Sequence, residues 1–338
     1  MAAKEKWLAG DVPAAREVLE RSFVANPESE QIWLAAVKLE AENGEFGVAR
    51  ELLIRARTVA DTERVSYPSC VAHKILIFFK IWMKSAVFER QQNQLSTALS
   101  TLSTAISRFP KFAKLYMVQG QIHQQQCNNT AARASYAAGI KACPKEPTLW
   151  ILASRLEEAD GKSIKARALL DKARQANPGN DLLWAEAAGV EERSGAGSVQ
   201  AKATLSRGLQ ECPSSGLLWS MAVWAEPRAS RKTKGVDALR KTKDSPLVVC
   251  TVARVLWADR VIERARDWFG RATATDPDLG DVWAWWLKFE RQHGTEVRSI
   301  MFYHFIVYSS MCDFRNNERL LGRKRLLLTP TTHRCGNR

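Results

Sequence analysis

Two glycine-containing motifs in this sequence have residue types that could bind a nucleotide, and both are incomplete. Gly161-Lys162-Ser163 matches the end of a phosphate-binding loop, in which backbone amides and a lysine hold the phosphates. That loop needs a preceding strand and a glycine five residues before Gly161, where Leu156 stands. Gly195-Ala196-Gly197 lacks the third glycine of a dinucleotide-binding turn. We therefore interpret both motifs as turns between helices.

Histidine and cysteine, which most often bind transition metals, form no recognisable site. Cys127 and Cys143 lie 16 residues apart with His123 close by, but a metal site would need further ligands. The seven cysteines include no CxxC pair, and their odd number argues against a disulfide framework. We therefore expect no catalytic activity, no cofactor and no metal ion. The histidines are scattered and form no HExxH pair: His73, His123, His293, His304 and His333.

A basic stretch in the second half of the chain is the surface feature whose composition could bind a ligand. Lysine and arginine attract RNA phosphates or an acidic segment of a partner protein, and the alternative is an ordinary solvated loop. No aromatic residue lies within the stretch to stack on a base, so we do not expect base recognition. The residues are Arg228, Arg231, Lys232, Lys234, Arg240, Lys241 and Lys243.

The net charge of +14 over 338 residues narrows the partners without choosing among them. A basic protein attracts RNA, acidic proteins and anionic membranes. Residues 297–338 contain eight Lys or Arg and two Asp or Glu, so this segment alone supplies +6. The longest apolar runs, 75–79 and 300–308, fall short of the roughly 20 residues that a membrane helix needs. We expect no membrane partner and no small-molecule substrate.

Large aromatic residues recur with a period of 34 to 35 residues. Trp150 and Trp184 are 34 residues apart, and Trp219 follows after another 35. Self-similarity at this period is typical of arrays of helix–turn–helix units. Each indole is expected to pack between the two helices of its unit, where it buries a large apolar area. The aromatic positions are Trp33, Trp82, Tyr116, Trp150, Trp184, Trp219 and Trp283, with Val249 as an apolar replacement.

Charged and small residues keep the same register. A glutamate follows the aromatic residue by seven positions, about two helical turns, and therefore lies on the same helix face. An alanine followed by a basic residue comes 16 or 17 positions after the aromatic residue, as in Ala49-Arg50 and Ala201-Lys202. Alanine permits close helix approach, and the glutamate and arginine are expected to form an ion pair within one repeat. The glutamates are Glu40, Glu157, Glu191, Glu226 and Glu290.

Proline and glycine mark the predicted helix ends. Proline lacks an amide donor and disfavours a helical conformation in the residue before it, so it stops the second helix of a unit. Glycines 44, 161, 195 and 294 predict the turn between the two helices. The fold class that follows is an all-α helical-repeat solenoid of antiparallel helix pairs. The stops are Pro27, Pro110, Pro144, Pro178, Pro213 and Pro277.

The array is predicted to cover residues 1–296, with three breaks in its register. Trp33 and Trp82 are 49 residues apart, which indicates an insert at 66–81. Only 30 residues separate Trp219 from Val249, so the unit near 220–249 is shortened. Beyond the array, 297–338 is expected to be a divergent, disordered basic tail.

The aromatic residue, the glutamate seven positions later, the alanine-basic pair and the final proline together resemble HAT (half-a-TPR) repeats, which are typical of RNA-processing complexes. The sequence between these positions resembles the C-terminal half of the pre-mRNA-processing factor six family over roughly 4–65 and 82–296. The family's long N-terminal region is not present, and neither 66–81 nor 297–338 has a family counterpart. We hypothesise that the latter two are translated intron. The segments that carry the resemblance are KEKWLAGDVPAAR at 4–16, NPESEQIWLAAVKLEAENGEFGVAR at 26–50, RLEEADGKSIKARALLDKAR at 155–174 and DLGDVWAWWLKFERQHGTE at 278–296.

The resemblance implies a non-catalytic nuclear scaffold that bridges components of the spliceosomal tri-snRNP. Its partners would be spliceosomal snRNP proteins, and any contact with RNA would be indirect. Three alternatives stay open: a direct RNA-binding protein, a HAT scaffold of polyadenylation or ribosomal RNA processing, and a peptide-binding co-chaperone of TPR type. The family-like sequence between the repeat positions disfavours the second alternative, and the Trp/Glu pattern disfavours the third.

Overall fold

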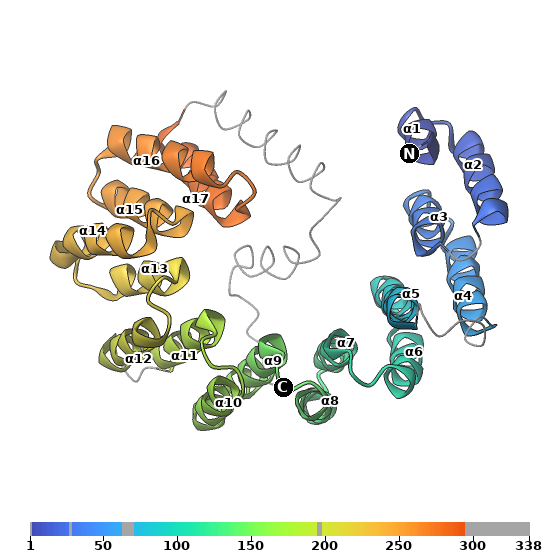
Figure 1. Cartoon of the computed structure of the whole chain (residues 1–338), viewed down its shortest axis with the longest axis horizontal. Coiled ribbons are helices and arrows are strands. Elements are labelled where there is room, and N and C mark those ends of the chain that lie inside the picture. The colour runs from blue at the N-terminus through green and yellow to red at the C-terminus, as the bar shows by residue number, and fades with distance from the viewer. Residues whose placement is uncertain (1, 27–28, 63–70, 195–197, 295–338) are drawn as a thin grey trace, which may run out of the picture. The chain divides into compact units, whose positions relative to one another are not determined.

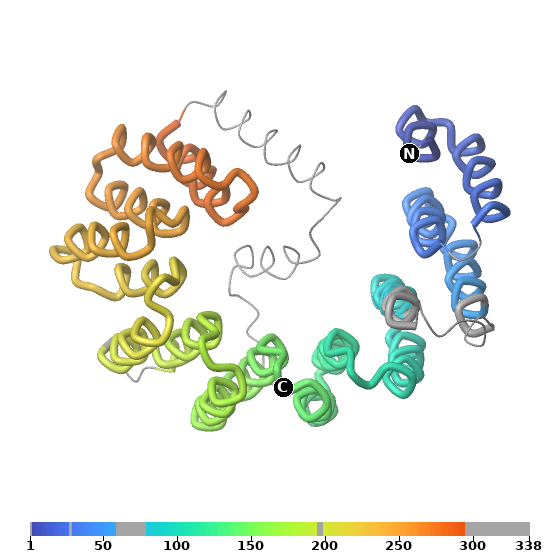
Figure 2. The backbone as a smooth tube through the Cα atoms, viewed as in Figure 1, coloured from blue at the N-terminus to red at the C-terminus, as the bar shows by residue number. Residues whose placement is uncertain are grey.

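A computed structural model describes residues 2–26, 29–62, 71–194 and 198–294. All regular structure in these ranges is helical, which confirms the predicted all-α repeat fold (Figure 1). The chain divides into two compact units, Met1–Leu169 and Leu170–Arg338. Odd-numbered helices are the first helices of the repeats and even-numbered helices are the second, and the tube in Figure 2 shows them joined by short turns.

The first compact unit contains the complete helices α1 to α9, and the next helix, α10 (Ser163–Ala176), spans the division between the units. A second helix packs against the first helix of its own repeat and against the first helix of the next repeat. The helices are α1 (Ala2–Leu8), α2 (Val12–Ala25), α3 (Glu30–Glu42), α4 (Phe46–Thr62), α5 (Val71–Gln91), α6 (Leu95–Arg108), α7 (Ala113–Gln125), α8 (Asn129–Ala142) and α9 (Pro147–Ala159).

The second compact unit repeats this arrangement and adds one short 3-10 helix. The described residues contain no helix that is both long and apolar enough to span a membrane. The helices are α11 (Asp181–Arg193), α12 (Ser198–Glu211), α13 (Gly216–Ala225), η3 (Arg228–Ser230), α14 (Arg231–Thr242), α15 (Pro246–Ala258), α16 (Ile262–Thr275) and α17 (Gly280–His293).

The second helices end where proline predicts. Four of them end two residues before the proline, and the residue between caps the helix, as Cys143 does for α8 before Pro144. Its backbone amide still donates to the carbonyl oxygen of Gly139, at 2.8 Å. The proline stop is confirmed for α6, α8, α12 and α16, which end at Arg108, Ala142, Glu211 and Thr275.

Close helix approach depends on small residues in the second helices. The predicted alanines are fully buried at 15, 49, 132, 166 and 265, and Ala201 is 7% exposed. Gly139 on α8 brings the backbones closer still, because a Cβ atom added there would lie 2.7 Å from the Cβ of Tyr116. Backbone contact of this kind fixes how far one helix stands from the next.

Two of the predicted register breaks have counterparts in the helices. Residues 71–81 of the predicted insert are part of α5, which is 21 residues long, while 66–70 lie outside the described residues. In the predicted shortened unit, α13 has 10 residues where α7, α9, α11 and α15 have 13 each. The predicted basic tail, 297–338, lies outside the described residues.

A single left-handed residue makes the turn between paired helices. At Gly161 (φ +76°) the amide donates to the carbonyl oxygen of Glu158, and the amide of Lys162 donates to that of Glu157. This closing pattern satisfies the last carbonyls of a helix and favours glycine, which has no Cβ to clash. Glycine is confirmed there at 44 and 161. Gly195 lies outside the described residues, and Gly294 caps α17 in an extended conformation.

Three turns use a residue that glycine would replace favourably. Asn93, Cys127 and Arg260 adopt φ of 60°, 56° and 61° at the position that Gly44 and Gly161 occupy elsewhere. A residue with a Cβ in this conformation carries a backbone penalty of about 1 kcal/mol. The sequence missed these turns because it signals the left-handed position only where glycine fills it.

Arg260→Gly should therefore raise the stability of the fold by about 1 kcal/mol, because it removes the left-handed penalty at an exposed turn. Urea unfolding followed by circular dichroism measures the change. Gly161→Ala is the matched control and should lower stability by a similar amount, since nothing lies within 4 Å of the added Cβ. Equal midpoints for both variants and the unmodified chain would contradict this explanation.

Candidate functional site

The glutamates of the first helices pair with the preceding repeat, not with their own. Arg16 on α2 reaches Glu40 on α3 at 2.6 Å, and Arg133 on α8 reaches Glu157 on α9 at 2.7 Å. The expected ion pair within one repeat is wrong. A first helix packs between two second helices, and its glutamate lies on the side of the earlier one. The ion pairs therefore join successive repeats across their seams.

Five such pairs are present in the described residues. In four of them the partners are 24 residues apart, and in the pair of Arg50 with Glu89 they are 39 apart. The difference of 15 equals the number of extra residues between Trp33 and Trp82, 49 − 34. The seam pair therefore forms across the predicted insert. The pairs are Arg16–Glu40, Arg50–Glu89, Arg133–Glu157, Lys202–Glu226 and Arg266–Glu290.

The sequence analysis missed Glu89 although its signal was present. Glu89 follows Trp82 by seven positions, as the other glutamates follow their aromatic residues. Its Oε1 and Oε2 accept hydrogen bonds from Nε and Nη2 of Arg50, at 2.8 and 3.0 Å. The expected glutamate at 191 is half-buried on α11, the equivalent helix of its repeat.

Burial makes these seam pairs stronger than surface ion pairs. The carboxylate side chains of Glu40, Glu89 and Glu290 are 7%, 8% and 1% exposed, whereas their arginines are 20% to 43% exposed. Hydrogen bonds to the glutamates raise the pKa of Arg16, Arg50 and Arg266 above the ordinary value, and Coulomb attraction adds to this. A charge-assisted, two-pronged contact of this kind also fixes the angle between the joined helices.

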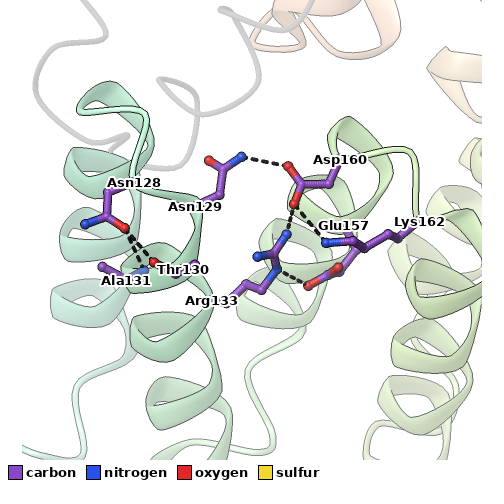
Figure 3. A network of polar contacts seen from close by, with 8 residues as sticks. All are labelled: Asn128, Asn129, Thr130, Ala131, Arg133, Glu157, Asp160 and Lys162. Atoms are coloured by element: carbon purple, nitrogen blue, oxygen red, sulfur yellow. Dashed lines mark hydrogen bonds and ion pairs between the residues drawn. The ribbon is translucent and has the colours of Figure 1, made fainter.

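One seam extends into a larger network that includes the phosphate-loop-like motif (Figure 3). Asp160, in the turn after α9, binds Arg133 and accepts a hydrogen bond from Nδ2 of Asn129 at 2.6 Å. Nζ of Lys162 lies 3.3 Å from the same carboxylate. This lysine therefore already has an acidic partner in a helix–helix turn. In addition, Asn128 caps α8 by accepting from the amide of Ala131 at 3.1 Å.

The repeated aromatic residues are tied to the proline stops. The indole Nε1 of Trp150, Trp219 and Trp283 donates to the carbonyl oxygen of the proline six residues earlier, at 3.0, 2.8 and 2.7 Å. The hydroxyl of Tyr116 does the same to Pro110 at 3.1 Å. The constant spacing of six was visible in the sequence but not interpreted. Trp33, Trp82, Tyr116, Trp150 and Trp184 are buried, and Trp219 and Trp283 are half-buried.

Four of the seven residues in the basic stretch stabilise the shortened repeat. Arg228 and Lys232 each lie 2.9 Å from a carboxylate oxygen of Asp259, and their hydrogen bonds hold the pKa of that carboxyl below its ordinary value. Arg231 donates to the carbonyl oxygens of Trp224 and Glu226, at 3.2 and 2.9 Å, and so caps α13. Lys234 lies 3.9 Å from Glu226.

The other three basic residues are available to a ligand. Arg240, Lys241 and Lys243 are exposed, and no acidic partner for them is present in the described residues. The fold also changes the surroundings of the stretch, because it brings tryptophans from α13 against it. The guanidinium of Arg231 lies 4.5 Å from the Trp224 ring centroid, and Nζ of Lys234 lies 5.7 Å from that of Trp219. The absence of aromatic residues applied to the linear sequence alone.

The geometry contains no arrangement for catalysis among the described residues. No group of three or more His, Cys, Asp or Glu side chains in these ranges is placed to hold a metal ion. The polar side chains that come together are seam pairs and helix caps, which hold helices in place.

Comparisons with known proteins agree with this architecture. A tetratricopeptide repeat family model matches residues 1–61 and 89–147. Human Pre-mRNA-processing factor 6 is 52% identical over 69 residues, which cover 20% of this chain and 7% of that protein. The chain is a TPR-like repeat protein similar to pre-mRNA-processing factor 6. The resemblance to this family that the sequence showed is thereby confirmed over the matched segment.

Two further relatives extend the comparison. Pre-mRNA-splicing factor prp1 of Schizosaccharomyces pombe is 44% identical over 66 residues, 20% of this chain and 7% of that protein. The chain thus matches less than a tenth of the length of these two splicing-factor relatives. A solved tetratricopeptide repeat protein from Parabacteroides merdae covers 77% of this chain and 98% of its own, with 13% identity and a TM-score of 0.43.

Glu40→Gln should lower stability by about 1 to 2 kcal/mol, because the buried seam loses a charge-assisted hydrogen bond to Arg16. Glu42→Gln, two residues further along α3, is the matched control. Glu42 is 51% exposed and pairs only with Lys38 on the same helix, so its replacement should cost less than about 0.5 kcal/mol. Urea unfolding of both variants measures the difference, and equal losses would show that the seam pair contributes nothing special.

Proposed function

We propose that this chain is a non-catalytic scaffold in pre-mRNA splicing, which holds spliceosomal snRNP proteins together in the nucleus during tri-snRNP assembly. The observation that carries the proposal is the 52% identity to human Pre-mRNA-processing factor 6 over 69 residues. The name of the fission yeast relative, a pre-mRNA-splicing factor, supports the same process.

The physical form of the chain suits this role. Repeats that contact only their neighbours build long surfaces on which extended segments or helices of partners can bind. Buried seam pairs such as Arg50–Glu89 and Arg266–Glu290 hold successive repeats at fixed angles, so these surfaces are formed before a partner arrives. A preformed surface binds with a smaller loss of conformational entropy.

Affinity purification of the tagged full chain from nuclear extract, followed by mass spectrometry, tests this function. We expect tri-snRNP proteins that remain after RNase treatment. Ala132→Glu, which places a carboxylate at a fully buried helix contact, should lose them because it opens the array between α7 and α8. Recovery of cleavage-factor or nucleolar proteins, or only of RNase-sensitive mixtures, would contradict the proposal.

Direct RNA binding is a second candidate, favoured by the three exposed and unpaired basic residues at the end of α14. If RNA contacts them, converting Arg240, Lys241 and Lys243 to Glu should weaken binding of a 12-nucleotide oligouridine by at least about tenfold and reduce its salt dependence. Nitrocellulose filter binding at several salt concentrations measures both.

The control for this experiment applies the same charge change elsewhere. Lys4, Lys6 and Arg55 are exposed, and replacing them with Glu should alter affinity far less. Reversing Arg231 would be uninformative, since it would also remove the cap of α13. Unchanged affinity in the α14 variant would eliminate RNA binding by this stretch.

A further inference from the structure

A half-buried arginine lies between two tryptophans on three successive first helices of the second compact unit. Arg254 on α15 has its guanidinium carbon 3.6 Å from the ring centroid of Trp285 on α17 and 4.7 Å from that of Trp224 on α13. Helix α15 packs against both of the other helices. A guanidinium in contact with two indoles gains cation–π energy and is positioned with few rotamers left to lose.

This arginine has no acidic partner within the described residues. Its Nε is buried and donates to nothing, and no carboxylate forms an ion pair with it. Burial lowers the pKa of Arg254 to about 10, so the group stays charged at neutral pH while part of its hydration is lost. An unsatisfied, charged donor of this kind is costly in a folded protein, and an incoming acceptor would reduce that cost.

Two more cations without carboxylate partners surround the same tryptophans. The guanidinium of Arg231 lies 4.5 Å from the Trp224 centroid and donates only to backbone carbonyls. Nζ of Lys288, which is exposed, lies 5.0 Å from the Trp285 centroid. We call Arg231, Arg254, Lys288, Trp224 and Trp285 the Trp–Arg cluster. Three positive charges with no acidic side chain paired to them are complementary to a run of carboxylates.

We propose that the Trp–Arg cluster is a docking site for an acidic segment of a partner protein, whose Asp or Glu carboxylates bind the free edge of Arg254 and the ammonium of Lys288. This rests on the proposed function as a protein scaffold and names one surface for it. Planar carboxylates match the fork of guanidinium donors. The chain's own segment 297–338 is strongly basic, so it does not supply this run of carboxylates.

Nucleic acid fits this cluster less well than a carboxylate does. Single-stranded RNA is held mainly by stacking its bases on aromatic faces. Both tryptophans here already have two cations within 5.0 Å of their ring centroids, so a base would have to displace a cation to stack. What the cluster offers outward is charge and hydrogen-bond donors.

Fluorescence anisotropy of a labelled octaglutamate peptide with the full chain tests the proposal. We expect saturable binding that weakens by about tenfold or more in Arg254→Gln, since a hydrogen bond to a charged group is lost. Lys288→Gln, at an exposed position that the fold does not need, should weaken binding by at least about threefold. Arg264→Gln on α16 removes an exposed, unpaired arginine outside the cluster and should change affinity less than twofold.

Three results would overturn the docking site. One is the absence of saturable octaglutamate binding, and another is an equal loss in Arg264→Gln, which would mean attraction by net charge alone. The third is tighter binding of oligouridine that is lost in Arg254→Gln, which would make the cluster an RNA site. None of these affects recovery of tri-snRNP proteins by the unmodified chain, so failure here is distinguishable from failure of the scaffold function.

Discussion

The contact between each second helix and the next first helix is the constraint on which this array depends. Within one repeat, a tight turn and an alanine contact keep the paired helices together. Between repeats, a carboxylate buried at the seam must meet a cation from the earlier helix, because an unpaired buried charge would be strongly destabilising. Where one charge is missing the other is missing too: Leu99 and His123, 24 residues apart, stand where a basic residue and a glutamate would form the pair.

The same constraint accounts for how the array tolerates a long insertion. The pair of Arg50 with Glu89 forms although 39 residues separate its partners, since the extra residues lengthen the segment that leads into α5 and leave the facing surfaces unchanged. Loop length changes closure entropy only slowly, whereas a misplaced seam carboxylate would carry its full desolvation cost. The shortened repeat shows the opposite case. There α13 ends early, and Arg231 satisfies the carbonyls that the missing turn leaves free.

Basic residues of this protein therefore divide by their surroundings rather than by their positions in the sequence. Arg228 and Lys232 share Asp259, and Arg231 is a helix cap, so these three belong to the fold. Arg254 was not distinguished by composition or spacing, and it becomes notable only because two tryptophans from other repeats contact it. Scaffold proteins bind through surfaces of this kind, which neighbouring repeats build jointly.

The sequence by itself determined the helices, their ends and their repetition, because proline, glycine, alanine and the aromatic period act through local backbone chemistry and helix-face geometry. It also determined the similarity to splicing-factor relatives. Only the tertiary structure decided which glutamate pairs with which arginine, since residues on one face of a helix can serve the repeat before or the repeat after. The left-handed turns at Asn93, Cys127 and Arg260 and the cluster around Arg254 were likewise decided by packing, which joins residues about 30 positions apart that no local pattern connects.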